Sequence, residues 1–395
     1  MTVSKVWHFR PDDTWFFRES RPQGAVGASE LASRFPPPAR TVAGAVRTAM
    51  GEAHGVDWAA FASGDGHAHG LEGLDLVEAL GDSHSPGQVA IRGPWLSWNG
   101  EPLFSAPALL LKRSSGAGEL CRLGIGDTVE TDLGRVPLPA LPEPGFAPLE
   151  GWWLTRAGLE SVLEGHVPAA SDDHRRLTGD LVAHEPRLGI ARDNRRGTVE
   201  EGMLYQTRHL RLRSEAGVVA EVAAPDVRLH PSDQRLRFGG EGRLASIRIG
   251  DEDSLALPGL PKDFSGAAGL ILVLLTDADL DGQWMPPGFE ATEVDGRQVW
   301  EGRIADVAVT IHAAALGKAV REGGWDVAGH KPRAVRSLLP AGSAWYVTTP
   351  DLSPAEAAER LHGQAVGHEQ ALGRGLVAAG VWPRHECPAE IFQGS

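Results

Sequence analysis

The chain has 395 residues, of which 42% are hydrophobic and 23% are charged, and its formal net charge is −14 at pH 7. This length and composition exclude a single small module, a disordered chain and a fibrous protein, and they favour two domains or one domain with long insertions. The overall negative charge counts against a nucleic-acid partner, because it repels phosphates.

The compartment is predicted from cysteine usage and apolar runs. Cys121 and Cys387 match no zinc or disulfide spacing, which is typical of a reduced, intracellular chain. The first residues lack the basic and then apolar order of a signal peptide. The longest apolar run, 267–275, is far below the roughly 20 residues of a membrane span. We therefore expect a cytoplasmic protein without membrane contact.

The basic residues are clustered. Residues 1–50 hold seven bases and four acids, residues 184–213 hold seven arginines and four acids, and residues 317–345 hold five bases and two acids. Only five of the 38 basic residues are lysines, and arginine can bind phosphate with two parallel hydrogen bonds. GC-rich codon usage would also favour arginine, but it would not explain the clustering. The three segments are therefore candidates for contact with nucleic acid.

The N-terminal pattern predicts a strand, a loop and a helix. Residues 5–10 fit a short strand, and the polar, proline-rich loop that follows ends at Pro38. Thr41 is a candidate N-cap for a helix whose apolar residues recur at helical spacing until Gly51 or Gly55.

The middle of the chain is predicted to carry insertions. Residues 51–90 are rich in Gly, Asp and His, and residues 114–150 are rich in Pro, and they lie on either side of a strand near 103–113. From Met203 polar and apolar residues alternate, which predicts a strand with one core face and one polar face.

The remaining pattern favours the α+β class. A helix is expected after Ser353, which forms a capping box with Glu356 and has Pro354 at the first helical position. Strands with only a few helices between them favour α+β sheets over a doubly wound parallel sheet. Further strands are predicted at 217–223, 243–249, 269–275, 307–313 and 343–348.

No motif for a metal, a cofactor or catalysis is complete in the sequence. The run Asp277, Asp279, Asp281 begins like an EF-hand loop, but its twelfth position is Gly288 in place of glutamate. A glycine pattern beginning at Gly240 fits dinucleotide binding, but a strand-like segment follows where that motif requires a helix. Walker, nucleophile-elbow and HExxH patterns are missing. We assign no metal, no cofactor and no catalytic residue.

Five short motifs follow one another between residues 7 and 382. They are Phe16-Phe17-Arg18-Glu19 with Arg21-Pro22 and the run from Phe35 to Arg47; Gly189-Ile190 to Tyr205; Phe238 to Arg243; Leu339 to Ser343; and Gly373 to Trp382. Each motif alone is weak, but five in this order are specific. Together they resemble the RAMP proteins of CRISPR systems, and in particular the third subunit of the type III-B Cmr module.

The resemblance implies two ferredoxin-like βαββαβ domains with long loop insertions near 51–90 and 114–150. The domains would span 1–225 and 226–395, and the second would hold a glycine-rich loop at 373–380. The resemblance also implies a non-catalytic subunit of an RNA-guided interference complex. That subunit would bind the 5′ handle of the crRNA and bridge the large palm-domain subunit to a backbone RAMP subunit.

The predicted RNA contacts combine the positive segments with glycine-rich turns. Glycines let backbone N–H groups approach phosphates, and arginines neutralise them. We expect the loops that bear these residues to converge on one cleft between the domains. The same residues could instead form solvated loops, a tight hairpin turn and a charged strand edge that make no contact with RNA. The candidates are Arg18, Arg21, Arg40, Arg47, Arg192, Arg195, Arg196, Gly239, Gly240, Gly242, Arg243, Lys331, Arg333 and Arg336.

Three other functions stay open. A repeat-processing endoribonuclease of the same superfamily would use a histidine such as His209 or His312 as acid or base, without a metal. A scaffold that contacts only proteins would use the acidic insertions as its surface. The equivalent subunit of a Csm-type complex would occupy the same position in another assembly.

Overall fold

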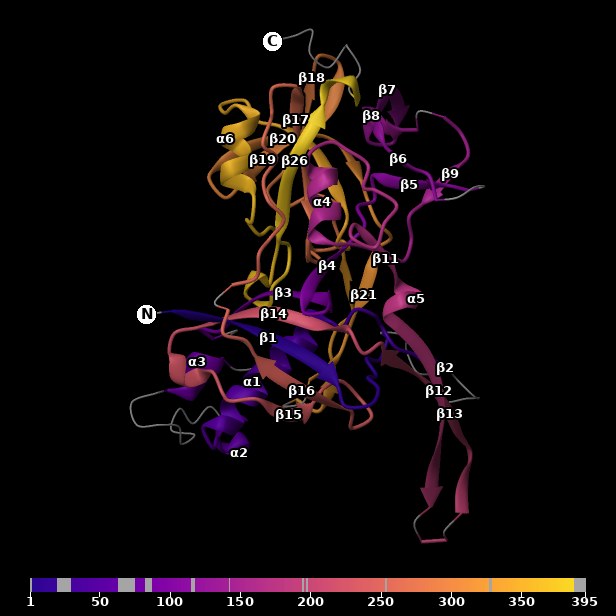
Figure 1. Ribbon diagram of the computed structural model, residues 1–395, viewed down its shortest axis with the longest axis vertical. Helices are drawn as coiled ribbons and strands as arrows, with labels where there is room; N and C mark the ends of the chain where they lie inside the picture. Colours follow the sequence, from indigo (N-terminus) through magenta and orange to yellow (C-terminus); the bar gives the residue numbers. More distant parts are fainter. Residues whose placement is uncertain are drawn as a thin grey trace.

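The fold combines antiparallel β-sheets with a few short helices, as a computed structural model of the chain describes it (Figure 1). The predicted α+β class is confirmed. In the part of the chain that the structure describes, no helix is long and apolar enough to cross a membrane. The structure describes residues 2–19, 30–62, 75–81, 87–114, 118–141, 143–193, 195–196, 198–252, 254–326 and 329–386. Among the candidate RNA contacts, Arg21 lies outside these residues.

The first sheet has eight strands. In chain order, they are β1 (Val3–Pro11), β3 (Ala90–Trp98), β4 (Glu101–Ser105), β10 (Trp152–Leu154), β11 (Arg175–Leu177), β14 (Ala216–Ala224), β15 (Gln234–Arg237) and β16 (Leu244–Ile249). Their order in space is β11-β10-β4-β3-β14-β1-β16-β15. Along β1 the buried Trp7 and Phe9 alternate with His8 and Arg10, so the two faces of the sheet differ in character.

Helix α1 (Ala39–Ala53) covers the apolar face of this sheet. Val46 and Met50 are fully buried in the same core as the aromatic residues of β1. The prediction that Thr41 caps the helix was wrong, because the helix already begins two residues earlier. Pro38 has the extended backbone of an N-cap, and its carbonyl oxygen accepts from the Thr41 amide at 2.9 Å. Thr41 therefore lies inside the first turn.

The second sheet has six strands. In chain order, they are β17 (Ala267–Leu274), β18 (Glu290–Val294), β19 (Arg297–Ile304), β20 (Val307–Ala315), β25 (Ala344–Thr348) and β26 (Val377–Pro383). Their order in space is β18-β19-β20-β25-β17-β26. Helix α6 (Pro354–Leu361) packs on β17 and β26, and it begins with the predicted capping box: Ser353 Oγ accepts from the Glu356 amide, and Glu356 Oε2 accepts from the Ser353 amide.

Both sheets contain the same order of four strands. In the first sheet these neighbours are β16, β1, β14 and β3, and in the second they are β26, β17, β25 and β20. In each case the spatial order is fourth, first, third and second along the chain, and all neighbouring pairs are antiparallel. In the described residues, the first of the four strands is followed by an α-helix only in the first sheet, where this helix is α1. The third strand is followed by an α-helix only in the second sheet, where this helix is α6.

The first sheet extends beyond the predicted domain boundary at residue 225. Strands β15 and β16 pair into this sheet, since β16 satisfies the free edge of β1. The chain therefore passes from one sheet to the other between Ile249 and Ala267.

The predicted insertions contain regular structure of their own. Their elements are α2 (Trp58–Ala62), α3 (Leu76–Leu80), β6 (Leu120–Arg122), β7 (Gly124–Thr131), β8 (Gly134–Ala140) and β9 (Phe146–Pro148). The second insertion is preceded by β5 (Leu110–Arg113), in the segment where a strand was predicted, and is followed by α4 (Arg156–Leu163). Strand β8 packs on β19 and β20, and α4 packs on β26. Figure 1 shows α1, α2 and α3 on one side of β1 and β14, and the second sheet on the other side.

The two halves of the molecule share one core between the sheets. Val6, Leu159 and Tyr346 belong to a single apolar cluster. Trp95 Nε1 donates to the Leu275 carbonyl oxygen at 3.1 Å, and the Tyr346 hydroxyl donates to the carbonyl oxygen of residue 123 at 2.8 Å. The halves are therefore one packed body.

A long hairpin extends away from this body (Figure 1). It consists of β12 (Val182–Asp193) and β13 (Thr198–Leu212), and β2 (Glu30–Ala32) pairs in parallel with β13. The remaining elements are α5 (Thr178–Leu181), η1 (Val227–Leu229), β21 (Val320–Glu322), β22 (Trp325–Asp326), β23 (Lys331–Pro332), β24 (Arg336–Leu338), η2 (Gln370–Leu372) and η3 (Arg384–Glu386).

The glycine-rich loop before β26 lies directly against β3. Gly373 has a φ of +87°, and a Cβ at this position would overlap the carbonyl oxygen of Gly93. A side chain here would therefore be strained by its backbone and would collide with backbone that cannot give way.

We predict that Gly373→Ala lowers the free energy of unfolding by roughly 3 kcal/mol, because the strain of a positive φ is added to a steric overlap. Urea unfolding of the full chain measures the change. Gly242→Ala is the matched control, since Gly242 has a φ of +63° and open space around it. This control should lose only about 1 kcal/mol. Equal losses would mean that the contact with β3 is not tight.

Candidate nucleic-acid interface

A network of ion pairs joins the two halves of the molecule. Arg34, which precedes α1, donates to Asp277 Oδ2 at 2.6 Å and to Glu322 Oε2 at 2.7 Å. Arg374, in the glycine-rich loop, also donates to Glu322, and it donates to Glu369 Oε2 at 3.0 Å. The side chains of Arg374 and Glu322 are only 1% and 5% exposed. Buried charges of both signs thus compensate one another at this junction.

A cavity of about 430 Å³ lies beside this network. Its basic lining comes from both halves of the chain, since one residue lies on α1 and the others lie in or beside β23 and β24. Two of the three positive segments therefore meet at one place. The basic lining residues are Arg40, Lys331, Arg333 and Arg336.

Two of these bases are held by carboxylates of the protein, of which Asp279 is buried and Glu369 is half-buried. Arg40 forms an ion pair with Glu369, and burial lowers the pKa of the Arg40 guanidinium while Glu369 opposes that shift. Arg336 forms an ion pair with Asp279 and lies 3.4 Å from Glu369. The Asp279 hydrogen bond raises the pKa of Arg336. These two guanidiniums are therefore already bound within the protein.

The other two bases are less constrained. Arg333 Nη2 lies 3.6 Å from Asp326 Oδ1, which is too long for a direct hydrogen bond. Lys331 is exposed, and its ammonium group has no ion pair with a described residue. Lys331 and Arg333 thus contribute the most available positive charge to the cavity.

The remaining candidate arginines lie elsewhere. Arg192 lies on β12, and the exposed Arg195 and Arg196 lie in the turn of the long hairpin, which Figure 1 shows extending away from the body. Arg18 is exposed beside Ser33, with which its backbone forms a bridge, and Arg47 is half-buried on α1. The expected convergence of all three positive segments on one cleft is not seen in the described residues.

Acidic partners neutralise the base of the hairpin. Arg187 donates to Asp13 Oδ2 at 2.7 Å and to Glu185 Oε1 at 2.9 Å. Arg211 donates to Asp13 Oδ1 at 2.8 Å and to Glu185 Oε2 at 2.5 Å. Hydrogen bonds from these two arginines lower the pKa of Asp13 and of Glu185. The positive charge that the sequence shows here is therefore largely compensated.

The second glycine motif forms the turn between β15 and β16. The Gly240 amide donates to the Phe16 carbonyl oxygen at 2.8 Å, and a Cβ on Gly239 would collide with that oxygen and with the Phe17 ring. Gly242 has a positive φ and open space, and Arg243 Nη1 lies 3.6 Å from Asp13 Oδ2. Two of the family motifs thus pack on each other here. A role of these residues toward RNA stays a prediction.

Of the two histidines considered for acid–base chemistry, His209 is buried and His312 is half-buried. His209 lies between the hydroxyl groups of Thr14 and Thr207, each at 3.1 Å, and burial lowers its pKa to about 4. His312 shares a hydrogen bond of 2.8 Å with Thr348, and burial lowers its pKa to about 4 as well. Neither histidine lines the cavity. In the described part of the chain, no group of three or more His, Cys, Asp or Glu side chains could hold a metal ion.

Sequence reasoning missed the buried charges at the junction. Arg34 and Arg374 were not among the candidates, although Arg374 lies between two glycines of a family motif. The position of Arg374 between these glycines could have predicted its role: where both glycines pack closely, the charged residue between them is buried with them and needs partners of opposite charge. The acidic run that contains Asp277 and Asp279 was examined only as a calcium loop, and in the fold both carboxylates bind arginines.

Comparison with known proteins defines the family. Residues 7–382 match the family described as CRISPR-associated protein (Cas_Cmr3), so the chain belongs to this family of CRISPR-associated proteins. The resemblance to the third subunit of the Cmr module is thereby confirmed. A comparison with curated proteins gave no match.

Two solved structures are similar to the chain. One is a chain of the "Cryo-EM structure of the Type III-B Cmr-beta bound to cognate target RNA and AMPPnP, state 1", with 18% identity, 86% of each chain covered and a TM-score of 0.44. The other is a chain of the "Cryo-EM structure of the Type III-B Cmr-beta bound to cognate target RNA", with 18% identity, the same coverage and a TM-score of 0.42.

We predict that Arg374→Met lowers the free energy of unfolding by about 3 kcal/mol, because it removes the buried guanidinium that Glu322 and Glu369 share and leaves the buried Glu322 with Arg34 as its remaining partner among the described residues. Chemical denaturation of the full chain measures the loss. Arg360→Met is the matched control, since Arg360 and Asp306 form an exposed pair at 3.5 Å. Such a pair contributes at most about 1 kcal/mol. A loss as small as that of the control would show that the junction does not depend on Arg374.

The buried histidines predict a loss of stability in acid. An unfolded histidine binds its proton near pH 6.5, whereas His209 and His312 bind theirs only near pH 4, so the unfolded state holds more protons between these values. The free energy of unfolding should therefore fall as the pH drops through this window, by up to about 1.4 kcal/mol per pH unit for each histidine. Urea unfolding at pH 7 and pH 5 measures the slope. His209→Asn should reduce it, and exposed His166→Asn should not; equal slopes in both variants would contradict the prediction.

Proposed function

We propose that the chain is a non-catalytic subunit of a type III-B CRISPR effector complex and that it binds the 5′ handle of the crRNA. The observation that carries this proposal is the cavity between the two halves. It gathers basic side chains from α1 and from the segment 331–336, although the chain as a whole has a net charge of −14. Membership in the Cas_Cmr3 family supports the same role.

Single-stranded RNA fits the chemistry of this cavity. Lys331 and Arg333 can neutralise phosphates, while Arg40 and Arg336 are oriented by their carboxylate partners. An RNA phosphate would compete with Glu369 and Asp279 for those guanidiniums, so Lys331 and Arg333 provide most of the ionic attraction. The acidic surroundings make binding by the isolated chain weak, and a neighbouring subunit completes the positive groove.

The two halves of the chain are, in this proposal, two ferredoxin-like units. The strand order of fourth, first, third and second in both sheets supports it, and each unit keeps one of its two helices. The subunit bridges the large palm-domain subunit to a backbone RAMP subunit. The extended β12–β13 hairpin supports the bridge, because a two-stranded arm beyond the packed body gains its stability from a partner.

A repeat-processing endoribonuclease is disfavoured by the state of the histidines. A general base must reach the 2′-hydroxyl and must have a pKa near the working pH. His209 and His312 are hydrogen-bonded to threonines and have pKa values lowered to about 4. No observation favours the protein-only scaffold or the Csm-type assembly over the proposed role.

We predict that Lys331→Gln and Arg333→Gln each reduce the salt dependence of handle binding by the assembled complex. Each change removes about one phosphate contact, so the slope of log K against log salt should shrink by roughly 0.7 per site, the single-strand value. Fluorescence anisotropy with a labelled handle RNA, measured over a range of salt concentrations, gives the slope.

Arg303→Gln is the matched control, because Arg303 is exposed on β19 and donates to its neighbour, the carbonyl oxygen of Asp306. Its slope should equal that of the unaltered complex. A slope that does not change in the two cavity variants would place the handle elsewhere. Cleavage of repeat RNA by the pure chain would instead favour the endoribonuclease, and co-elution with the large subunit without any RNA retention would favour the scaffold.

A further inference from the structure

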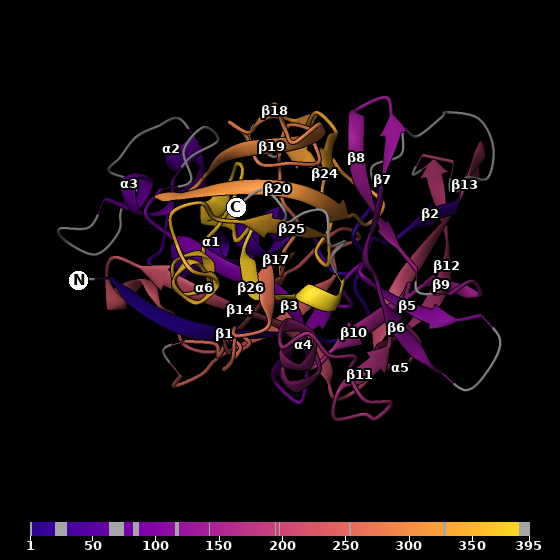
Figure 2. The same ribbon diagram turned by 90° about the horizontal axis from the view of Figure 1, so that it is seen from above.

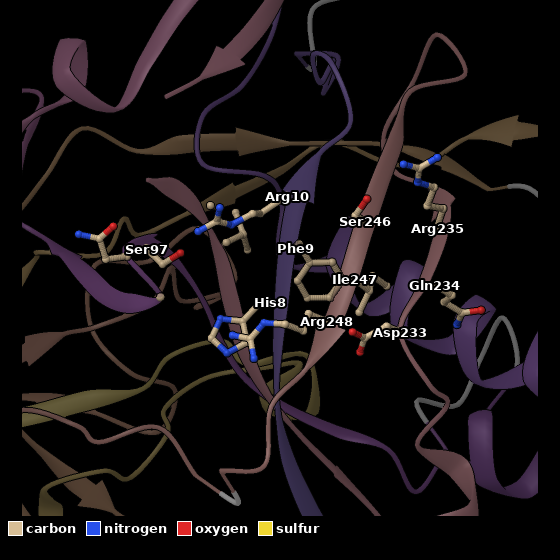
Figure 3. Close-up of a pocket in the computed structure, with 14 residues that line it drawn as sticks. His8, Phe9, Arg10, Ser97, Asp233, Gln234, Arg235, Ser246, Ile247 and Arg248 are labelled. Atoms are coloured by element: carbon tan, nitrogen blue, oxygen red, sulfur yellow. The ribbon is translucent and has the colours of Figure 1, made fainter. Parts of the chain in front are cut away.

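The second face of the first sheet is only partly covered. Near Val6, Trp95 and Val219 this face packs against the second half of the molecule. Farther along the same strands the second half no longer covers it. A cavity of about 630 Å³ opens there, within the size range of small-ligand sites (Figure 3).

The floor of this cavity is a row of residues that crosses five strands. Gly217 on β14 is paired with Ser97 on β3, and Ser246 on β16 is paired with Arg10 on β1 and with Arg235 on β15. A Cβ at Gly217 would lie 3.2 Å from Ser97 Oγ and 3.7 Å from the Arg10 side chain. A side chain at Gly217 would be crowded, and its absence lets the Ser97 hydroxyl and the Arg10 side chain lie close over the backbone of β14.

Two arginines project into the cavity without acidic partners among the described residues. Arg10 Nη1 donates only to the Ser214 carbonyl oxygen, at 3.0 Å. Arg248, paired in register with His8, has neither a hydrogen bond nor an ion pair in the described part of the chain. Figure 3 shows the Arg248 side chain alongside the His8 ring, between β1 and β16.

Three further polar side chains line the cavity. Arg235 lies 3.3 Å from Asp12 and is thereby partly neutralised. Asp233 is engaged with a backbone amide of β16 at 3.1 Å. His8 Nε2 is buried and has no hydrogen-bond partner among the described residues. Within the described part of the chain, a buried nitrogen without a hydrogen-bond partner and two guanidiniums without a carboxylate partner thus lie around one concave space, which favours an anionic ligand.

We propose that this cavity binds a nucleotide, with its phosphate held by Arg10 and Arg248 and its sugar and base over Gly217 and Ser97. Guanidinium groups match phosphate with parallel hydrogen bonds and can also stack on bases. The phosphate comes either from a free mononucleotide or from an RNA strand. The site goes beyond the handle-binding role, and it shares no lining residue with the cavity that holds Lys331 and Arg333.

The test uses the full chain and calorimetric titration with adenosine 5′-monophosphate, cytidine 5′-monophosphate and inorganic phosphate. We expect saturable binding of a mononucleotide. Arg10→Gln and Arg248→Gln should each weaken it about tenfold, since each removes a charged hydrogen bond to phosphate. Arg303→Gln and Arg360→Gln, at exposed arginines outside both cavities, are the matched controls, and both should bind as the unaltered chain does. Loss of mononucleotide binding in Lys331→Gln alone would place the nucleotide in the other cavity and overturn this proposal.

A labelled RNA of six nucleotides then identifies the source of the phosphate. Displacement of the mononucleotide by this RNA supports a strand in the site, and retention of the mononucleotide supports a free nucleotide. Circular dichroism of Arg248→Gln, whose side chain is exposed on its strand, shows that the fold is kept. The proposal is overturned if neither mononucleotides nor RNA bind saturably, or if the two arginine variants bind as tightly as the controls.

Discussion

The arrangement of this molecule depends on the buried charges at the junction of its two halves. Arg374 and Glu322 are removed from water, which is tolerable only because each finds partners from a distant part of the chain. Arg34 supplies the partner from the first half, and it is positioned by the loop that leads into α1. A charge network of this kind is directional, unlike apolar packing, so it selects one relative position of the sheets. The network thereby also fixes the relative position of the two sides of the cavity that lies beside it.

Glycines complete the same constraint at two places. Gly373 brings the C-terminal loop against the backbone of β3, and Gly239 brings the β15–β16 turn against the Phe16 carbonyl oxygen. Phe238, next to that turn, contacts the rings of Phe9, Trp15 and Phe17 with centroid distances of 5.4, 4.9 and 5.3 Å. The motifs that carry the family resemblance therefore mark contacts between distant segments of the chain.

Much of the fold was predictable because alternation of apolar residues is a local signal. Strands β1, β14, β17, β20 and β25 were predicted from such local apolar patterns, and the start of α6 was predicted from its capping box. The domain boundary was not, since the pairing of β16 with β1 is a contact between distant segments. In the candidate site, the sequence identified the bases near 331–336 and Arg40. It could not identify Asp279 and Glu369 as their partners, because neutralisation depends on which carboxylates the fold brings close.

The packing of α4 and β8 on the second sheet affects how the chain acquires its structure during synthesis. Leu159, Val162 and Leu163 of α4 are completely buried, yet the strand they cover, β26 (Val377–Pro383), is separated from α4 (Arg156–Leu163) by most of the second half of the chain and is synthesised much later. Until residues 377–383 leave the ribosome, this apolar surface has no permanent cover, and exposed surface of that kind promotes aggregation. Productive folding of the first half is thus completed by β26, and a chain that stops before Val377 loses far more than one edge of a sheet.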